Sequence, residues 1–319
     1  MTTALLEAKN LKKYFLQRRT KKYLRAVDDV SFTITKGQTF GLVGESGCGK
    51  STLGSTLLRL YEPTSGQILF SDVDICALSR SELRKYRRNM QMIFQDSYSC
   101  FNPRMKIAEI LAEPLVIHQV RSKAERKARV RELLDLVGLN QDSSGKYIHE
   151  LSGGQRQRLG IARAIALHPK IIVADEPVSA LDVSIQSQIL NLMVDLKEKF
   201  GLSYLFISHD LAVVEHISDV VAVMYMGKLV EIASCDDFFK GPKHPYSKIL
   251  LDSIPNISKK KDRKKIVIHG DVPNPLQLPR GCSFHPRCPL ASKVCKESTP
   301  LIKKVANTRK EHMVACHHL

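Results

Sequence analysis

The chain has 319 residues, with 49 Lys and Arg against 32 Asp and Glu, eight cysteines and no tryptophan. This length suffices for one large α/β domain with a well-buried core and a smaller appendix, and a hydrophobic content of 43% excludes a disordered chain. No apolar run reaches the roughly 18 residues that a membrane-spanning helix needs. The first residues lack the basic and apolar regions of a signal peptide, so we expect a cytosolic protein.

A formal net charge of +17 suggests a polyanionic partner, such as nucleic acid, an anionic membrane face or nucleotide phosphates. Composition alone leaves these open, together with a basic surface that binds nothing. Four cysteines are scattered, and four crowd the C-terminal end between Pro and His residues, namely Cys282, Cys288, Cys295 and Cys316. In a reducing cytosol such a terminal group indicates metal or cluster ligation rather than disulfides.

The N-terminal part of the chain predicts strands and then helices. Short alternating runs over residues 4–40 predict antiparallel strands and turns. An apolar run at 39–43 predicts a buried strand, and a glycine-rich stretch after it leads into a helix over 51–60. Helical periodicity with many charges over about 103–137 predicts a helical subdomain, which we place at about 96–158.

The following part alternates strands and helices. Apolar runs at 171–174 and 204–208 predict fully buried parallel strands. A helix is predicted between them, over 183–200. This order fits a right-handed crossover in a mixed sheet.

A change in composition marks a boundary near residue 240. Gly, Pro and His cluster over 241–246, so we divide the chain into 1–240 and 241–319. Beyond the boundary we expect a short helix, a basic run at 259–265 and the cysteine-bearing tail. The basic run is most simply a solvated linker rather than a binding patch. No internal repeat is evident.

The glycine-rich stretch fits the phosphate-binding loop pattern and lies between a predicted strand and a predicted helix, as that motif requires. Its glycines let the backbone curl so that successive N–H groups and the helix N-terminus face an anion. Lys50 would meet the β- and γ-phosphates, and the Ser51 hydroxyl would bind Mg²⁺. The residues assigned to the nucleotide here are Gly44, Glu45, Ser46, Gly47, Cys48, Gly49, Lys50, Ser51 and Thr52.

A second motif ends an apolar strand in two carboxylates. Asp175 and Glu176 directly follow four apolar residues, and a carboxylate at the C-terminal end of a strand lies where α/β sheets bind ligands. Asp175 therefore suits a magnesium shell, and Glu176 is placed to polarise an attacking water as a general base. The alternative is a surface acidic turn.

A third motif opens a predicted helix with Ser152, Gly153, Gly154 and Gln155. A hydroxyl and unobstructed amides at a helix start offer another anion site. By spacing alone, the motif could be an N-cap and nothing more.

The string Leu-Ser-Gly-Gly-Gln, between a phosphate loop and an acidic strand end, closely resembles the signature of ATP-binding cassette (ABC) ATPases. The resemblance covers about residues 5–235, because further elements of the family follow in order. It implies an α/β fold whose core is a P-loop NTPase domain of the ABC-ATPase type. An antiparallel β subdomain, a helical signature subdomain and a small C-terminal extension would complete that fold.

The resemblance also implies roles for further residues. Phe15, or its neighbour Tyr14, matches the aromatic residue that stacks on adenine. Gln95 matches the glutamine that contacts Mg²⁺, the water and the membrane partner, and His209 matches the switch histidine on the γ-phosphate. Asp182 matches the loop that crosses the dimer interface.

In this family the signature of one subunit closes over the phosphate loop of another, so the resemblance implies a dimer that holds two ATP. Positive charge and amides around the transferred phosphoryl group would supply most of the catalysis. Glu176 and His209 keep the hydrolysis-competent pattern. We therefore expect an enzyme that hydrolyses ATP to ADP and phosphate.

The tail, at 244–251 and 281–289, is similar to the C-terminal extension of the ATPase subunits of oligopeptide and dipeptide importers. Residues 97–105 also resemble the second, F-type, of the two ATPases that those systems carry. Cys100 and Phe101 depart from that subunit, which has a small residue and leucine there.

The four tail cysteines have wider gaps than most zinc sites and ferredoxin runs. Relatives of this importer class can hold a 4Fe–4S cluster at such cysteines. A 4Fe–4S cluster, zinc and free thiols are therefore the three interpretations of Cys282, Cys288, Cys295 and Cys316.

Cys48 lies inside the phosphate loop, where it is most simply a tolerated variable position. The alternative is that the loop amides and Lys50 lower the pKa of its thiol. Such a thiol would be sensitive to alkylation.

The sequence thus predicts an ATP-hydrolysing subunit that powers a membrane importer for dipeptides or oligopeptides. The implied partners are a second ABC ATPase subunit in a heterodimer, two permease subunits and an extracytoplasmic solute-binding protein. The chain would be peripheral, on the cytoplasmic face of the inner membrane. Import of nickel, glutathione or another small solute is the nearer alternative. A soluble protein acting on ribosomes or DNA is the remoter one, because the chain has one phosphate loop, one signature and no heptad insert, so we expect no nucleic acid partner.

Overall fold

The computed structural model describes residues 3–19, 21–96, 98–119, 122–253, 273–306 and 311–319. The chain divides into two compact units. The helical unit holds Met1–Thr3, Thr35–Gly37 and Ala77–Ile207, and the phosphate-loop unit holds Ala4–Ile34, Gln38–Cys76 and Ser208–Leu319. The predicted basic run at 259–265 lies outside the described residues.

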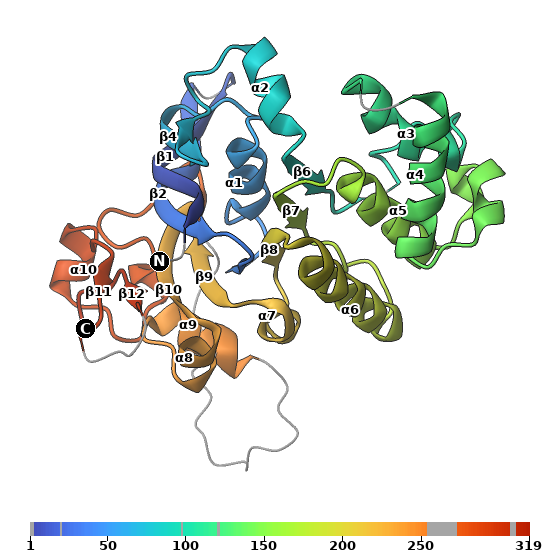
Figure 1. Ribbon diagram of the computed structural model, residues 1–319. Coiled ribbons are helices and arrows are strands. Elements are labelled where there is room, and N and C mark those ends of the chain that lie inside the picture. The colour runs from blue at the N-terminus through green and yellow to red at the C-terminus, as the bar shows by residue number, and fades with distance from the viewer. Residues whose placement is uncertain (1–2, 20, 97, 120–121, 254–272, 307–310) are drawn as a thin grey trace. The chain divides into compact units, whose positions relative to one another are not determined.

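The phosphate-loop unit contains a four-stranded sheet in the order β2-β1-β4-β5 (Figure 1). Its strands are β1 Ala4–Gln17, β2 Lys22–Thr35, β4 Ser65–Phe70 and β5 Val73–Asp74. β1 and β4 are antiparallel, with Leu6 opposite Phe70. Alternate residues of β2, such as Val30 and Phe32, are buried, as a period-two pattern requires. The antiparallel strands predicted over residues 4–40 are confirmed.

A second sheet region of this unit carries the glycine-rich turn. β3 Thr39–Val43 is wholly buried and pairs in parallel with β9 Val220–Tyr225. β9 is antiparallel to β10 Lys228–Ser234, which pairs with β12 Met313–Val314, and β12 pairs with β11 Lys303–Lys304. The C-terminal part of the chain therefore extends the same sheet that holds β3. The helices of the unit are α1 Lys50–Leu57, α7 Leu211–Ile217, α8 Cys235–Lys240, α9 Pro245–Asp252, α10 Lys293–Glu297 and the 3₁₀ turn η3 His285–Arg287.

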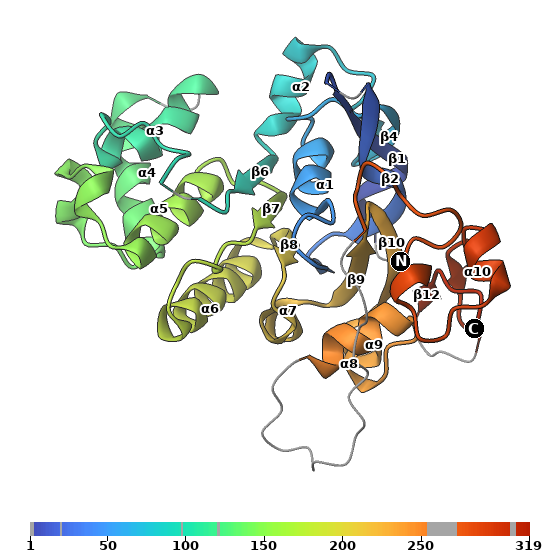
Figure 2. The same cartoon turned by 180° about the vertical axis from the view of Figure 1, so that it is seen from behind.

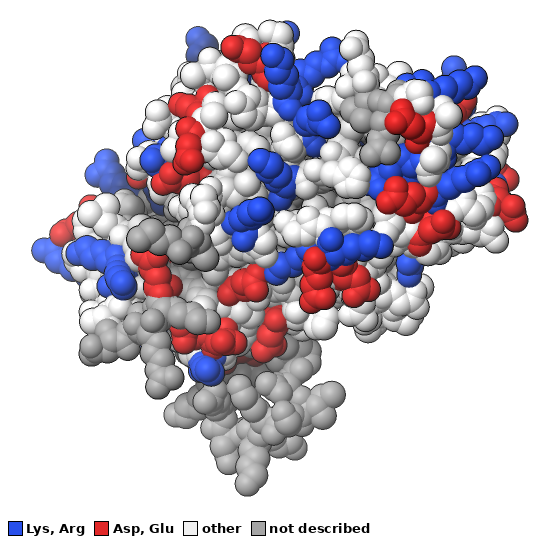
Figure 3. Space-filling model, in the orientation of Figure 1, with Lys and Arg blue, Asp and Glu red and all other residues white. Residues whose placement is uncertain are grey.

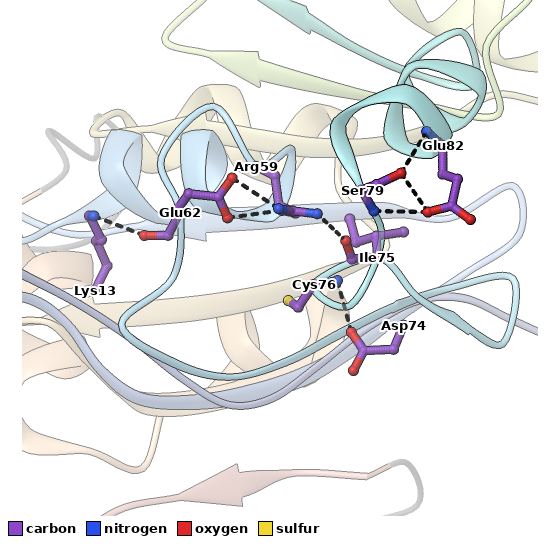
Figure 4. Close-up of polar contacts among 8 residues, drawn as sticks. All are labelled: Lys13, Arg59, Glu62, Asp74, Ile75, Cys76, Ser79 and Glu82. Carbon is purple, nitrogen blue, oxygen red and sulfur yellow. Dashed lines mark hydrogen bonds and ion pairs between the residues drawn. The ribbon is translucent and has the colours of Figure 1, made fainter.

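Arg59 holds the turn that follows α1 (Figure 4). Its guanidinium donates to both carboxylate oxygens of Glu62, at 3.0 and 2.9 Å, and to the carbonyl of Ile75 at 2.6 Å. Lys13 Nζ donates to the Glu62 carbonyl at 2.8 Å. Arg59 has a φ of 49°, which is not helical, so α1 ends at Leu57 rather than at the predicted residue 60.

The start of α9 depends on a buried histidine. His244 is 1% exposed, and its Nδ1 accepts the N–H of Tyr246 at 3.1 Å, so the ring caps the helix. Burial lowers the pKa of His244 from its ordinary value of 6.5 to about 4, and Lys248 adds to this while Glu231 opposes it. The folded chain therefore holds the ring neutral at neutral pH.

We expect the free energy of unfolding to fall by about 3 kcal/mol as the pH drops from 6.5 towards 4, because the unfolded chain takes up a proton that the folded ring excludes. The stability due to this residue is fully present above pH 6.5. Urea unfolding at a series of pH values would measure the loss. His244→Asn keeps a side-chain acceptor at the cap and removes the titration, so its stability should vary less with pH over this range. Equal pH dependence of the two chains would contradict the prediction.

The helical unit contains three parallel strands and five α-helices in its described part. Its strands are β6 Met90–Ile93, β7 Ile171–Asp175 and β8 Ser203–Ser208, and Val173 of β7 lies opposite Met92 and Leu205. Its helices are α2 Arg80–Arg87, α3 Ile107–Ile117, α4 Lys123–Leu136, α5 Gly153–Ile165 and α6 Val183–Phe200, with 3₁₀ turns η1 Gln141–Gly145 and η2 Ile148–Glu150. The predicted buried strands and the helix over 183–200 are confirmed. No helix among the described residues is long and apolar enough to cross a membrane.

α3, α4 and α5 pack side by side (Figures 1 and 2). Arg129 of α4 is 2% exposed and donates to the carbonyls of Ile165 and Ala166, at 2.9 and 3.4 Å. The last carbonyls of a helix have no partner within that helix, so Arg129 satisfies two of those at the end of α5. This contact joins the helix that follows the signature motif to the rest of the helical unit.

Candidate active site

The glycine-rich turn after β3 is packed against backbone from two other strands. A Cβ on Gly44 would lie 2.2 Å from the Met224 carbonyl oxygen, and a Cβ on Gly49 would lie 2.0 Å from the Ala26 carbonyl oxygen. Gly49 is also the N-cap of α1, with a φ of 109°. These two positions require glycine, so the turn has the curled backbone that a phosphate loop needs.

Lys50 begins α1 and lies within this loop. Its side chain is buried, and its Nζ donates to the carbonyls of Gly44 and Glu45 at 2.7 and 3.0 Å. Ser51, the next residue, is exposed. The loop therefore gathers an ammonium group and a helix N-terminus, which together favour an anion.

Cys48 is only 5% exposed in the same loop. Burial raises the pKa of its thiol above the ordinary value, and the Lys50 ammonium, whose Nζ lies 3.9 Å from Sγ, offsets this only in part. The alternative of a low-pKa, reactive thiol at Cys48 is therefore wrong, because burial outweighs the neighbouring cation.

We expect Cys48 to stay unmodified when the native chain meets a maleimide at neutral pH, because its thiolate is scarce and its sulfur is covered. Peptide mass spectrometry would measure the labelling. The chain unfolded in urea is the positive control. Rapid labelling of native Cys48 that ATP prevents would contradict the prediction.

Asp175 and Glu176 lie at the end of β7 in the helical unit. Asp175 is 5% exposed, and Glu176 has a φ of 46°, which residues other than glycine rarely adopt. The Glu176 N–H donates to the Ile207 carbonyl at 2.9 Å, and Gln95 Nε2 donates to Glu176 Oε2 at 3.1 Å. The structure thus brings together two predicted site residues that are 81 positions apart. Such a backbone is strained at a residue other than glycine, and strained residues are enriched in functional sites.

The signature motif forms a capping box at the start of α5. Ser152 Oγ accepts the N–H of Gln155 at 3.3 Å, and Gln155 Oε1 accepts the N–H of Ser152 at 3.0 Å. A Cβ on Gly154 would lie 2.7 Å from Ile185 Cγ2 of α6, so this glycine permits close packing of the two helices. The predicted N-cap is therefore present. Asp182 is the N-cap residue of α6 in the same unit.

Phe15 and Tyr14, the two candidates for stacking on adenine, lie near the end of β1. Phe15 is half-buried and edge-on to Tyr61, with ring centroids 5.5 Å apart. The Tyr14 hydroxyl donates to Asp28, and burial together with this bond raises the pKa of Tyr14 to about 12. Arg25 lies over the Tyr14 ring. Lys13 Nζ lies over the Phe15 ring, 4.7 Å from its centroid, so both rings make local contacts, and the phenol of Tyr14 is in addition held by its hydrogen bond to Asp28.

His209 directly follows β8 and is exposed. The next residue, Asp210, caps α7 by accepting the N–H of Ala212 at 2.8 Å. The strand end and the helix cap therefore fix the backbone on both sides of His209.

The four tail cysteines lie in one lobe of the phosphate-loop unit. The N–H of Cys282 donates to the Cys295 carbonyl at 2.8 Å, and Cys295 Sγ lies 3.5 Å from His318 Nε2. Burial raises the pKa of the Cys282 thiol, and the other three thiols raise it further. Within the described part of the chain, no three His, Cys, Asp or Glu side chains are arranged to hold a metal ion.

Two residues of the C-terminal part contact the phosphate loop although no sequence spacing predicts it. Tyr246 Oη accepts the N–H of Glu45, and Arg287 pairs with the Glu45 carboxylate. They lie 201 and 242 positions from Glu45. The only signal in the sequence is that both belong to the segments that resemble an importer extension.

A phosphate loop between a buried strand and a helix, in a mixed α/β fold, defines a P-loop nucleotide-binding protein. A solved chain described as a dimeric post-hydrolysis state of the ATP-binding cassette MJ0796 bound to ADP and Pi matches with a TM-score of 0.66 and 28% identity. That match covers 72% of this chain and 99% of the other. The ABC transporter family model matches residues 27–179, and the model of the oligopeptide/dipeptide transporter C-terminal region matches 230–295.

Full-length relatives agree with these matches. The oligopeptide transport ATP-binding protein AppF of Bacillus subtilis is 52% identical, over 98% of this chain and 97% of its own length. A putative peptide import ATP-binding protein of Brucella ovis is 49% identical over 98% of each chain. The chain belongs to the ATP-binding proteins of ABC transporters, and it is an ABC-type ATPase.

Proposed function

We propose that the chain is the ATP-hydrolysing subunit that powers a membrane importer for dipeptides and oligopeptides. The phosphate loop carries this proposal, because Gly44 and Gly49 admit no side chain and Lys50 lies within the loop. The match to the oligopeptide/dipeptide transporter C-terminal region and the 52% identity to AppF support the substrate class.

We assign the nucleotide contacts as follows. Phe15 stacks on adenine, and residues 44–52 hold the phosphates. The hydroxyl of Ser51, the amide of Gln95 and the carboxylate of Asp175 would hold Mg²⁺, since oxygen atoms are the ligands this ion prefers. When bound, Mg²⁺ neutralises charge on the β- and γ-phosphates.

Glu176 is the proposed general base, which takes a proton from the attacking water. Gln95 supports this role, because its hydrogen bond orients the Glu176 carboxylate. His209 would contact the γ-phosphate. Residues 152–155 and Asp182 would act across a dimer interface, on the nucleotide of a second subunit.

The proposed partners are a second ABC ATPase subunit, two transmembrane permease subunits and an extracytoplasmic solute-binding protein. MJ0796 is described as a dimer bound to ADP and Pi, which supports a dimer here. The chain would lie on the cytoplasmic face of the inner membrane. Charges of both signs lie on the face in Figure 3.

We also propose a division near residue 240, with a helical subdomain at about 96–158. The family model for the C-terminal region begins at residue 230, and α9 starts at Pro245. α3 and α4, and the start of α5, fall within the proposed helical subdomain.

Reconstitution tests the proposed function. The chain would be placed with its second ATPase and permeases in lipid vesicles, and the peptide-loaded binding protein added. Peptide uptake and stimulated ATP hydrolysis are expected, and Lys50→Ala should abolish both. Stimulation by nickel or glutathione, with none by peptides, would overturn the substrate class.

For the cysteine lobe we propose a 4Fe–4S cluster held by Cys282, Cys288, Cys295 and Cys316. Four thiols in one lobe match the Cys₄ donor set of such clusters, and the hydrogen bond from the Cys282 N–H to the Cys295 carbonyl holds two of the four residues together. Iron and sulfide assays, with visible absorption of anaerobically purified protein, test this proposal. A colourless sample with zinc, or with no metal, would refute it.

A further inference from the structure

Glu45, the second residue of the phosphate loop, is held by an arginine from the C-terminal part of the chain. Arg287 Nη1 lies 2.8 Å from Glu45 Oε2, and Nη2 lies 2.9 Å from Oε1. The side chains are 7% and 25% exposed, so water competes little with the pair. A two-point contact of this kind fixes the orientation of the carboxylate as well as its position.

The backbone of Glu45 is held at the same time. Its N–H donates to Tyr246 Oη at 2.9 Å. The buried ring of Tyr246 packs against Tyr225 and Phe284, with ring centroids 4.7 and 5.3 Å away. Because this aromatic group is buried, the hydroxyl is an anchored acceptor rather than a mobile one.

This contact reaches the reactive part of the loop through Lys50. The Lys50 ammonium donates to the carbonyls of Gly44 and Glu45, which flank the Glu45 N–H along the chain. Any shift of residue 45 would move both acceptors. The loop is also held at its other end, where the Gly227 N–H donates to the Cys48 carbonyl at 2.9 Å.

We propose that Arg287 and Tyr246 are positioning residues of the ATP site, through which the C-terminal extension holds the phosphate loop in its ATP-binding conformation. This inference rests on the proposed function of the loop. The C-terminal extension, residues 241–319, then contributes directly to ATP binding. Arg287 directly precedes Cys288 in the sequence, so the residue that pairs with Glu45 lies beside the cysteine lobe.

The test measures the affinity of the full-length chain for a fluorescent ATP analogue without Mg²⁺. Arg287→Met is expected to weaken binding roughly tenfold, since it removes a charge-assisted contact. Arg280→Met is the matched control, because Arg280 is an exposed arginine of the same extension, and it should bind as the unchanged chain does. Arg287→Lys keeps the charge without the two-point contact, so its affinity for the ATP analogue should lie between those of Arg287→Met and the unchanged chain.

A double-mutant cycle separates positioning from general stability. Glu45→Gln should weaken binding about as much as Arg287→Met, and the double variant should be no weaker than either, because both changes break one contact. Tyr246→Phe should weaken binding as well. Thermal unfolding confirms that each variant is folded, and Arg287→Lys, a milder change, keeps the test available if Arg287→Met unfolds.

The outcomes separate this inference from the proposed function. If Lys50→Ala binds ATP as tightly as the unchanged chain, the proposed function of the loop fails. If Lys50→Ala loses binding and Arg287→Met does not, only this inference fails. Additive effects of Glu45→Gln and Arg287→Met would also overturn it, since they would show independent structural damage.

Discussion

A Glu176→Gln variant is expected to hydrolyse ATP about a hundredfold to ten-thousandfold more slowly, because an amide cannot take the proton of the attacking water. The change preserves shape, and Gln95 Nε2 still has the side-chain oxygen of residue 176 as an acceptor. The backbone at residue 176 is fixed by its bond to Ile207, so the fold should not change. Binding of ATP is therefore retained while hydrolysis is lost, and the variant should accumulate with ATP bound.

Phosphate release measured at saturating ATP checks this prediction. Glu198→Gln is the matched control, since Glu198 is an exposed glutamate of α6 in the same unit, and its rate should not change. A rate for Glu176→Gln within a few fold of the unchanged chain would show that another group acts as the base.

A Glu231→Gln variant is expected to lose about 3 kcal/mol of unfolding free energy, because a buried carboxylate accepts from several donors at once. Glu231 is fully buried on β10. Its Oε1 accepts from the Lys243 N–H at 2.6 Å and contacts His312 Nε2 at 2.7 Å, and its Oε2 accepts from the His244 N–H at 2.9 Å. Whichever way a glutamine is turned, its NH₂ group faces one of these donors.

The pKa of Glu231 is consistent with this account. Burial alone would raise it, but the bonds from His312 and from the amides of Lys243 and His244 hold it below its ordinary value of 4.5. The carboxylate is therefore ionised at neutral pH. This contribution to stability is present above pH 4.5 and is lost as the pH falls below it.

Urea unfolding at neutral pH measures the loss in Glu231→Gln. Glu215→Gln, a change at an exposed glutamate on α7 of the same unit, is the control and should unfold with the unchanged chain. If both variants unfold at the same urea concentration as the unchanged chain, the hydrogen bonds to the Glu231 carboxylate do not stabilise the fold.

The motifs that could be predicted from sequence are those set by local chain geometry. A strand, a glycine turn and a helix follow one another within residues 39–57, so the phosphate loop can be predicted from the sequence. The capping box at Ser152 and Gln155 also depends on a spacing of three residues. Such features depend on neighbours along the chain, and the structure has them where they were expected.

The features that sequence could not predict depend on distant packing. Burial of Cys48 raises the pKa of its thiol more than the Lys50 ammonium lowers it. A sequence motif does not show which of its side chains are buried. The end of α1 depends on the turn held by Arg59 and Glu62. An arginine such as Arg287 does not by itself indicate a functional site, because arginine is common on protein surfaces.

The pairing of β10 with β12 bears on how the chain folds as it is made. Glu231 of β10 pairs with Val314, and its carboxylate contacts His312, 81 positions later. During synthesis, β10 therefore leaves the ribosome well before its neighbour, and it presents an unpaired strand edge and a carboxylate that His312 does not yet contact. Such an edge is a natural contact for chaperones, and mutations that slow formation of β12 should reduce the yield of soluble protein before they affect ATP hydrolysis.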